Sequence, residues 1–259
     1  LIGKDSNATV IDPAGANTLT DLFGIYADTQ TGLLVKNIGV TGAYDRIKWV
    51  NVDSSTISGD SVSSNGQRGI YLFNGSDTNT LTNNTSRDNS LYGFQLSSSS
   101  NNTLTNNTSQ NNSSVGFYLL TAGNNTLTNN ISQNNASFGF RMSTTSNNNT
   151  LTNNTSRNNA SYGFQLLNAA NNTLTQNTSD YNADYAFFID LASSSETFNK
   201  NVFVPSPYAA YKDSGVWNQS TVTTNKFTFT RNWWGTADSV AIDKLIWGPG
   251  ADSIIYSPW

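Results

Sequence analysis

A strict alternation of apolar and polar positions recurs through the middle of the chain. In the run Gly93-Phe94-Gln95-Leu96, the apolar side chains of Phe94 and Leu96 fall on one side of an extended backbone and Gln95 falls on the other. This period of two predicts a strand with one buried face. Matching runs occupy positions 116–119, 139–142, 163–166 and 186–189. The chain is therefore predicted to repeat one short strand many times.

A second apolar position repeats at the same period. It is the Leu of a recurring Thr-Leu-Thr triplet, with spacings of 23, 23, 24 and 23 residues between Leu81, Leu104, Leu127, Leu151 and Leu174. Weaker copies of the pattern include Leu34, Ile57, the run Gly69-Ile70-Tyr71-Leu72, and Phe198. This period is too short for paired helices, and the Asn, Thr, Ser and Gly content disfavours helix.

The repeat therefore predicts an all-β solenoid. We expect about nine coils of 23–24 residues over positions 34–203, with the most regular part at 79–189. Coils that pair as strands stack about 4.8 Å apart, so the rod would be roughly 40 Å long.

One Asn recurs in register with the apolar positions. It falls at Asn84, Asn107, Asn130, Asn154, Asn177 and Asn201, with Asn37 and Asp60 at the preceding positions. A side-chain amide both donates and accepts hydrogen bonds, so stacked Asn residues can bond along the axis, as in cross-β ladders. Asn also tolerates the left-handed conformation of sharp corners. These residues are predicted to be structural.

The pattern N-N-T-L-T-N-N-T-S-x-N-N-x-x-x-G-F-x-L resembles the repeat of the NosD-like family of secreted and surface proteins. The strong match covers positions 79–189 and a degenerate one covers 34–203. The resemblance implies a right-handed parallel β-helix with three short strands per coil. The chain departs from the family where Ile or Val is usual, because it carries Ser86, Ser109, Ser132, Ser156 and Ser179. That departure suggests a slimmer core on one side or an unusual corner.

The two ends break the repeat and are expected to cap it. Positions 1–33 are expected to form an irregular cap or an assembly segment that adds a strand to another subunit. Positions 204–259 form an irregular region and a C-terminal cap. Its N-x-W-G and P-W elements resemble the closing segment of surface β-helix proteins, and they comprise Asn232, Trp234, Gly235, Pro258 and Trp259. Cap packing, with a sugar-binding shelf as the alternative, is predicted for Trp233, Trp234, Trp247 and Trp259.

Composition narrows the chemistry. The 259 residues are 36% hydrophobic but only 12% charged, with a net charge of −4 and neither His nor Cys. The lack of a basic cluster argues against nucleic-acid binding. The lack of Cys excludes thiolate metal sites, and the lack of His removes the commonest general base. No apolar run is long enough for a membrane span. We expect no cofactor, with calcium as the one alternative.

Carboxylates are scarce in the repeat. The densest group contains the calcium candidates Asp180, Asp184, Asp190 and Glu196. Glycoside hydrolysis needs two facing carboxylates, and a calcium-dependent lyase needs several Asp on one face with a basic residue. Arg46-Ile47-Lys48 resembles a substrate-binding triplet of polygalacturonases, but that family's paired Asp and Gly-His-Gly are missing. The sequence is therefore predicted not to be an enzyme, and no catalytic residue is assigned.

Asn-x-Ser/Thr glycosylation motifs are abundant. Those outside the repeat begin at Asn7, Asn74 and Asn218, and those in register within it begin at Asn101, Asn124, Asn148 and Asn171. Outward-facing copies are expected to carry glycans in a cell that glycosylates its surface proteins. Coils about 4.8 Å apart are narrower than a glycan, so full occupancy of one column is not expected.

The leading functional hypothesis is a non-catalytic structural protein, extracellular or at the cell surface. It would self-associate into a filament, sheath or surface layer through its coil ends or by strand addition. The alternative is an adhesin or carbohydrate-binding module that uses outward Tyr118, Phe188 or the terminal Trp residues to contact cell-surface glycans. A polysaccharide lyase or hydrolase is the third hypothesis.

Overall fold

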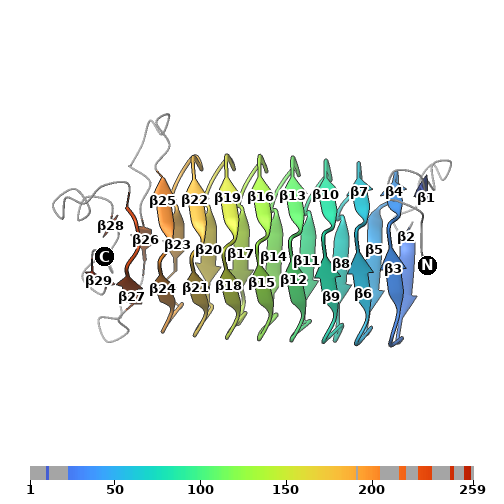
Figure 1. Ribbon diagram of the computed structural model, residues 1–259, viewed down its shortest axis with the longest axis horizontal. Coiled ribbons are helices and arrows are strands. Elements are labelled where there is room, and N and C mark those ends of the chain that lie inside the picture. The colour runs from blue at the N-terminus through green and yellow to red at the C-terminus, as the bar shows by residue number, and fades with distance from the viewer. Residues whose placement is uncertain are drawn as a thin grey trace.

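A computed structural model of the protein describes residues 10–11, 23–190, 192–204, 216–219, 227–234, 246–247 and 254–257. These residues form strands and connecting turns without a helix, and the strands build three parallel sheets (Figure 1). Successive coils contribute one strand to each sheet in turn, so every pairing is between neighbouring coils. The prediction of an all-β parallel solenoid with three strands per coil is confirmed.

Sheets A, B and C contain ten, nine and ten strands in the described part of the chain. Sheet A consists of β3 (Leu34–Lys36), β6 (Thr56–Ser58), β9 (Thr80–Thr82), β12 (Thr103–Thr105), β15 (Thr126–Thr128), β18 (Thr150–Thr152), β21 (Thr173–Thr175), β24 (Thr197–Asn199), β27 (Phe227–Thr230) and β29 (Ile254–Ser257). Sheet B consists of β1 (Val10–Ile11), β4 (Gly39–Thr41), β7 (Ser61–Ser63), β10 (Thr85–Arg87), β13 (Thr108–Gln110), β16 (Ile131–Gln133), β19 (Thr155–Arg157), β22 (Thr178–Asp180) and β25 (Val202–Val204). Sheet C consists of β2 (Phe23–Asp28), β5 (Asp45–Val50), β8 (Ile70–Phe73), β11 (Phe94–Ser97), β14 (Phe117–Leu120), β17 (Phe140–Ser143), β20 (Phe164–Leu167), β23 (Phe187–Ile189), β26 (Val216–Asn218) and β28 (Ile246–Trp247).

The core consists of like residues stacked on like. The repeated Leu of sheet A is buried in every regular coil, and the first Phe of the sheet C strands forms a column of parallel rings. Along that column, ring centroids are 4.7 Å apart between Phe94 and Phe117 and 4.9 Å apart between Phe117 and Phe140. Each coil therefore buries its apolar side chains mainly against its neighbours, as expected of a solenoid.

One register assignment from the sequence is wrong. Val35, not Leu34, pairs with Ile57 in the Leu column, and it is 4% exposed whereas Leu34 is 40% exposed. Asn37 is displaced in the same way. Ile38, not Asn37, donates its backbone N–H to Asp60 Oδ1, at 2.9 Å. The first coil lacks the Asn-Thr-Leu-Thr motif of the regular coils. Spacing along the sequence therefore assigned its residues one position out of register.

The repeated Ser explains the corner between sheets B and C. Ser109 Oγ donates to the carbonyl of Gly116 at 2.9 Å and accepts from Asn112 Nδ2 at 2.9 Å. A Cβ on Gly93, in the preceding coil, would lie against Ser109 Oγ and only 2.8 Å from the Gly116 carbonyl oxygen. The small Ser and the side-chain-free Gly therefore allow this close approach, where a branched apolar residue would not fit the same contacts.

The described part of the C-terminal region adds aromatic rings to the core. Trp234 is 1% exposed, and its ring lies 4.5 Å from Phe203 and 5.7 Å from Phe229 between centroids. Trp233 is half-buried and forms a bridge with Val202. Trp247 pairs with Trp217 along β28 and β26. Gly235, Pro258 and Trp259 lie outside the described residues, as do most of positions 1–22.

Candidate functional site

Buried Asn residues run along the solenoid in continuous ladders. Asn107 Oδ1 accepts from both the backbone N–H and Nδ2 of Asn84, each at 3.0 Å, and Asn130 Oδ1 does the same for Asn107 at 2.9 and 3.0 Å. Each Nδ2 in this ladder also donates to a carbonyl of the preceding coil, such as Leu81 O for Asn107. The sequence-assigned residues from Asn84 to Asn201 all belong to this ladder, and Asn232 extends it.

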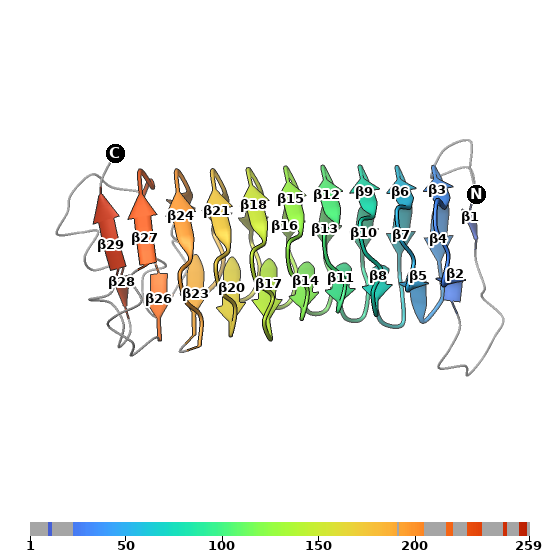
Figure 2. The ribbon, with the colours of Figure 1, turned by 90° about the horizontal axis from the view of Figure 1, so that it is seen from below.

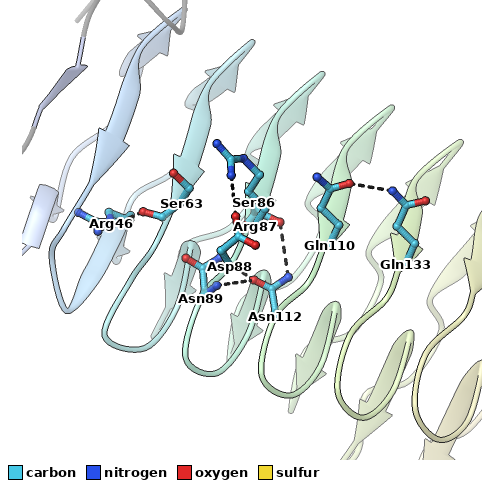
Figure 3. Close-up of polar contacts among 9 residues, drawn as sticks. All are labelled: Arg46, Ser63, Ser86, Arg87, Asp88, Asn89, Gln110, Asn112 and Gln133. Carbon is cyan, nitrogen blue, oxygen red and sulfur yellow. Dashed lines mark hydrogen bonds and ion pairs between the residues drawn. The ribbon is translucent and has the colours of Figure 1, made fainter.

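Two further ladders were missed in the sequence. One contains Asn79, Asn102, Asn125, Asn149 and Asn172. The other contains Asn89, Asn112, Asn135, Asn159 and Asn182, and Figure 3 shows its Asn89 and Asn112 side by side at the corner after sheet B. The signal was present, because these Asn residues recur at the same period. All are buried, so the ladders serve the scaffold and offer no ligand site.

Carboxylates stand at the ends of two ladders. Glu196 accepts from the backbone N–H of Asn172 at 2.5 Å, and burial raises its pKa to about 8. Asp60 precedes Asn84 in the first ladder and accepts from Ile38, and burial raises its pKa to about 6. Both shifts follow from desolvation, which disfavours the charged form.

The outer face of sheet C carries an aromatic strip. The rings come from the sheet strands and from the residues just before them, and they are Tyr71, Tyr92, Tyr118, Phe138, Tyr162, Tyr185, Phe188 and Trp217. They pack across coils: ring centroids are 5.2 Å apart for Tyr92 and Tyr118, 4.8 Å for Tyr162 and Phe188, and 5.3 Å for Tyr185 and Trp217. The rings cover one another: Tyr71, Tyr118 and Phe188 are only 7%, 9% and 9% exposed, and the other rings of the strip are half-buried.

Arg141 lies in the middle of the aromatic strip. Its guanidinium carbon is 5.1 Å from the ring centre of Tyr118 and 5.5 Å from that of Phe138, which is cation–π distance. Its Nε is buried without a hydrogen-bond partner. The ion pairs found in the described part of the chain, Arg68–Asp45 and Arg87–Asp88, leave Arg141 out. Arg141 therefore offers an uncompensated positive charge between aromatic rings.

A polar cluster lies at the N-terminal end of the strip. Arg68 Nη1 lies 3.1 Å from Oδ1 of Asp45, a carboxylate that is 2% exposed, and the Arg68 guanidinium lies 4.4 Å from the Tyr71 ring centre. Lys48 Nζ is 5.7 Å from the same ring. Burial raises the pKa of the Tyr71 phenol, although Arg68 and Ser97 act in the opposite direction. The Tyr71 hydroxyl therefore keeps its proton at neutral pH and can donate a hydrogen bond.

The triplet Arg46-Ile47-Lys48 does not act as a unit. Its side chains alternate along β5, so Ile47 enters the core while Lys48 lies on the outer face. Arg46 is fully buried and donates to the carbonyls of Ser63 and Ser64, at 3.3 and 3.1 Å. Only Lys48 of the three therefore belongs to the outer polar cluster.

The four calcium candidates are not brought together. Glu196 is buried in an Asn ladder, and Asp190 accepts from Asn168 N at 2.8 Å and from Ser193 Oγ at 2.7 Å. Asp184 accepts from Ser161 Oγ at 2.8 Å, and Asp180 is the last residue of β22 in sheet B. No group of three or more His, Cys, Asp or Glu suitable for a metal occurs in the described part of the chain. Proximity in sequence misled here because the chain turns a corner between these residues.

The in-register glycosylation motifs fall on an exposed corner. Asn101, Asn124, Asn148 and Asn171 are all exposed and all have a positive φ between 56° and 58°. Asn74 is also exposed, and Asn7 lies outside the described residues. Asn218 is fully buried, so its amide cannot be reached by a transferase in the folded protein. Glycosylation at the exposed residues stays a prediction.

These features define an elongated parallel β-solenoid protein. A family model described as periplasmic copper-binding protein (NosD) matches residues 24–239, and the chain belongs to this family. No curated relative matches the sequence.

Several solved structures share the fold. The periplasmic alginate epimerase AlgG is 17% identical with a TM-score of 0.59, over 76% of this chain and 61% of that one. The mannuronan C-5 epimerase AlgE4 A-module of Azotobacter vinelandii is 15% identical with a TM-score of 0.54, over 77% and 72%. The Dettilon tailspike protein is 14% identical with a TM-score of 0.63, over 82% and 48%.

These comparisons correct one prediction. The sequence was predicted not to be an enzyme, but the two epimerases have the same solenoid fold. That prediction is therefore wrong: the regular repeat and the shortage of paired carboxylates do not exclude catalysis.

No helix in the described part of the chain has the length and hydropathy to cross a bilayer.

The copper in the family description does not fit this chain. Copper is held in proteins mainly by His, Cys and Met side chains. The sequence has no His and no Cys, and its single Met, Met142, is 1% exposed in the core. The side chains present therefore do not provide a copper site of the usual kind.

Proposed function

We propose that this protein binds a polysaccharide chain lengthwise on the outer face of sheet C, on the extracytoplasmic side of the cell envelope. The observation that carries the proposal is the aromatic strip with Arg141 at its centre. The parts of the rings that stay exposed give a sugar chain apolar contact, and polar groups beside them fix its orientation. The strip runs across successive coils, so one extended polymer can contact many rungs at once.

The positive groups on this face favour an acidic polymer. Lys48 and Arg141 lie on strands β5 and β17 of sheet C, and Arg68, just before β8, is paired with Asp45, which is 2% exposed. A guanidinium binds a carboxylate through parallel hydrogen bonds, which a neutral sugar cannot accept in the same way. The family description and the AlgG structure, both periplasmic, support the proposed location.

A glycan panel tests this function. The purified chain is passed over immobilised acidic and neutral polysaccharides at low and moderate salt. We expect retention on acidic polymers that weakens with salt, because the interaction is partly electrostatic and surface charges are screened. A blank result on every polymer, with protein shown to be folded, would rule out the binding surface.

Catalysis on the bound polymer is a second candidate function. The cluster of Asp45, Lys48, Arg68 and Tyr71 favours it, because a phenol, a carboxylate and two cations lie close together, with both cations within 5.7 Å of the Tyr71 ring centre. The test is a turnover assay on acidic and neutral polysaccharides, with and without calcium, comparing wild type with Tyr71→Phe. Turnover that Tyr71→Phe abolishes would place chemistry at this cluster, and no turnover by wild type would remove it.

We further propose that the rod self-associates through its N-terminal end, into a filament, sheath or surface layer. The first coil supports this, because Tyr26 and Leu34 are 48% and 40% exposed there. Edge strands of a solenoid also present backbone groups that can pair with another chain.

A further inference from the structure

The outer face of sheet A is a regular array of Thr. Five successive strands, β9, β12, β15, β18 and β21, all read Thr-Leu-Thr. In each strand the Leu is buried and both Thr side chains lie on the outer face. The strands pair without a register shift, so the first Thr of each aligns with the first Thr of the next, and the second with the second. Figure 2 shows these strands stacked in a straight row. We name this face the Thr lattice.

The spacing of the Thr lattice is fixed in two directions. Neighbouring parallel strands lie about 4.8 Å apart, and alternate residues within a strand are about 6.6 Å apart. The backbone beneath is held by the buried Asn ladders, including the bonds of Asn107 and Asn130 to the flanking coils. The hydroxyl and methyl groups therefore form a nearly rectangular and rigid grid.

The chemistry of the Thr lattice differs from that of the neighbouring face. All its positions are neutral, and none of its hydroxyls hydrogen-bonds another protein group among the residues that the structure describes. The outer positions of the same coils in sheet B vary widely and include Arg87, Ile131, Arg157 and Asp180. Strand propensity favours Thr at the outer positions of sheet A and of sheet B alike. It therefore does not explain why only one face is uniform and uncharged.

We propose that the Thr lattice binds the surface of an ice crystal. Both grid distances are close to the repeats of water oxygen atoms on the faces of ice. Each Thr offers a hydroxyl that can join the water network and a methyl group that excludes disordered water. A charged side chain would instead hold a hydration shell that does not fit a crystal. A rigid array keeps this match over five coils without an ordering cost on binding.

The proposal also explains why the Asn-Asn-Thr glycosylation motifs recur in register without assigning them a glycan. In Asn124-Asn125-Thr126 the middle Asn belongs to a buried ladder and the Thr belongs to the lattice. The first Asn occupies a corner with a φ of 56°. Each residue thus has a structural or surface role without a glycan. Ice binding is therefore expected of unglycosylated protein, since a glycan at Asn124 would stand beside the lattice.

The test compares two Thr residues of one coil. Thr152 lies in the lattice on β18, and Thr155 lies on the outer face of sheet B on β19, and both are half-buried. Full-length protein from a non-glycosylating host is assayed for thermal hysteresis and for inhibition of ice recrystallisation. We expect activity in wild type, loss of most of it in Thr152→Tyr, and wild-type activity in Thr155→Tyr. Unfolding curves for both variants check that the fold is kept.

Two results would overturn the proposal. One is a folded wild-type protein without hysteresis or recrystallisation inhibition. The other is an equal effect of the two substitutions. The result is independent of polysaccharide binding on sheet C, because Thr152→Tyr changes the outer face of sheet A alone.

Discussion

Glu196 occupies a ladder position that Asn fills in the five preceding coils. Burial raises its pKa from 4.5 to about 8, so the folded protein keeps a proton that the unfolded chain loses. This contribution to stability is fully present below pH 4.5 and is lost as pH rises towards 8. Asp60 shifts in the same direction but only up to about 6. Between pH 6 and 8.5, Glu196 is therefore the main source of change among the shifted carboxylates.

We predict that Glu196→Gln removes this pH dependence. In wild type the free energy of unfolding should fall by an amount on the order of a few kcal/mol between pH 6 and 8.5. Gln can accept from Asn172 without titrating, so the variant should be nearly flat across that range. Urea denaturation at several pH values measures this, and a variant that keeps the full decline would contradict the assignment.

Asn130→Ala is predicted to be strongly destabilising. The substitution removes the acceptor for the backbone N–H and Nδ2 of Asn107 and the donor to Leu104 O. Buried groups left unpaired cost about 1–3 kcal/mol each, so we expect a total loss of roughly 3–5 kcal/mol. Asn129→Gly is the matched control, because Asn129 is exposed and Gly retains its φ of 56°. Equal losses for the two variants would mean that the ladder does not carry stability.

At the scale of strands and corners, the sequence predicted the repeated strands and their buried columns. It did not predict the features that depend on contacts between neighbouring coils. The Leu and Phe columns followed from their period because burial imposes it directly. The sequence suggested an unusual corner as one of two readings of the repeated Ser, but the hydrogen bonds of Ser132 to Gly139 and Asn135 did not follow from the spacing, because they form only in three dimensions. The calcium candidates are close in sequence, but their spacing does not show the corners that separate them in the fold. They are Asp180, Asp184, Asp190 and Glu196.

The Ser corner gives a prediction at this scale. Ser132→Ala leaves the Gly139 carbonyl without its hydroxyl donor and should cost about 1–3 kcal/mol. Ser137→Ala, in the half-buried segment that follows, serves as the control and should stay within about 0.5 kcal/mol of wild type. Thermal melts of both variants measure the two changes in stability. A Ser132→Ala variant as stable as wild type would show that the corner needs only a small residue, not a hydroxyl.

The whole molecule is a straight stack with two distinct ends, β2 near one and β29 near the other (Figure 2). If the rods join through their N-terminal coil, electron microscopy of native material isolated without denaturant should show regular polymers. A charged substitution at exposed Leu34 should shorten them, because it places a charge in the joint. Single short rods under the same conditions would contradict assembly.

The central claim is that an acidic polysaccharide binds along the outer face of sheet C, and one pair of variants tests it. Arg141 lies in the aromatic strip, whereas Arg157 lies on the exposed outer face of sheet B, and each substitution by Ala removes one positive charge. The measurement is calorimetric titration of an acidic polysaccharide into wild type, Arg141→Ala and Arg157→Ala. We predict that Arg141→Ala weakens binding by about 10-fold or more, as expected when a charge-assisted hydrogen bond is lost, and that Arg157→Ala binds like wild type. Equal affinities for all three proteins would contradict binding along this face.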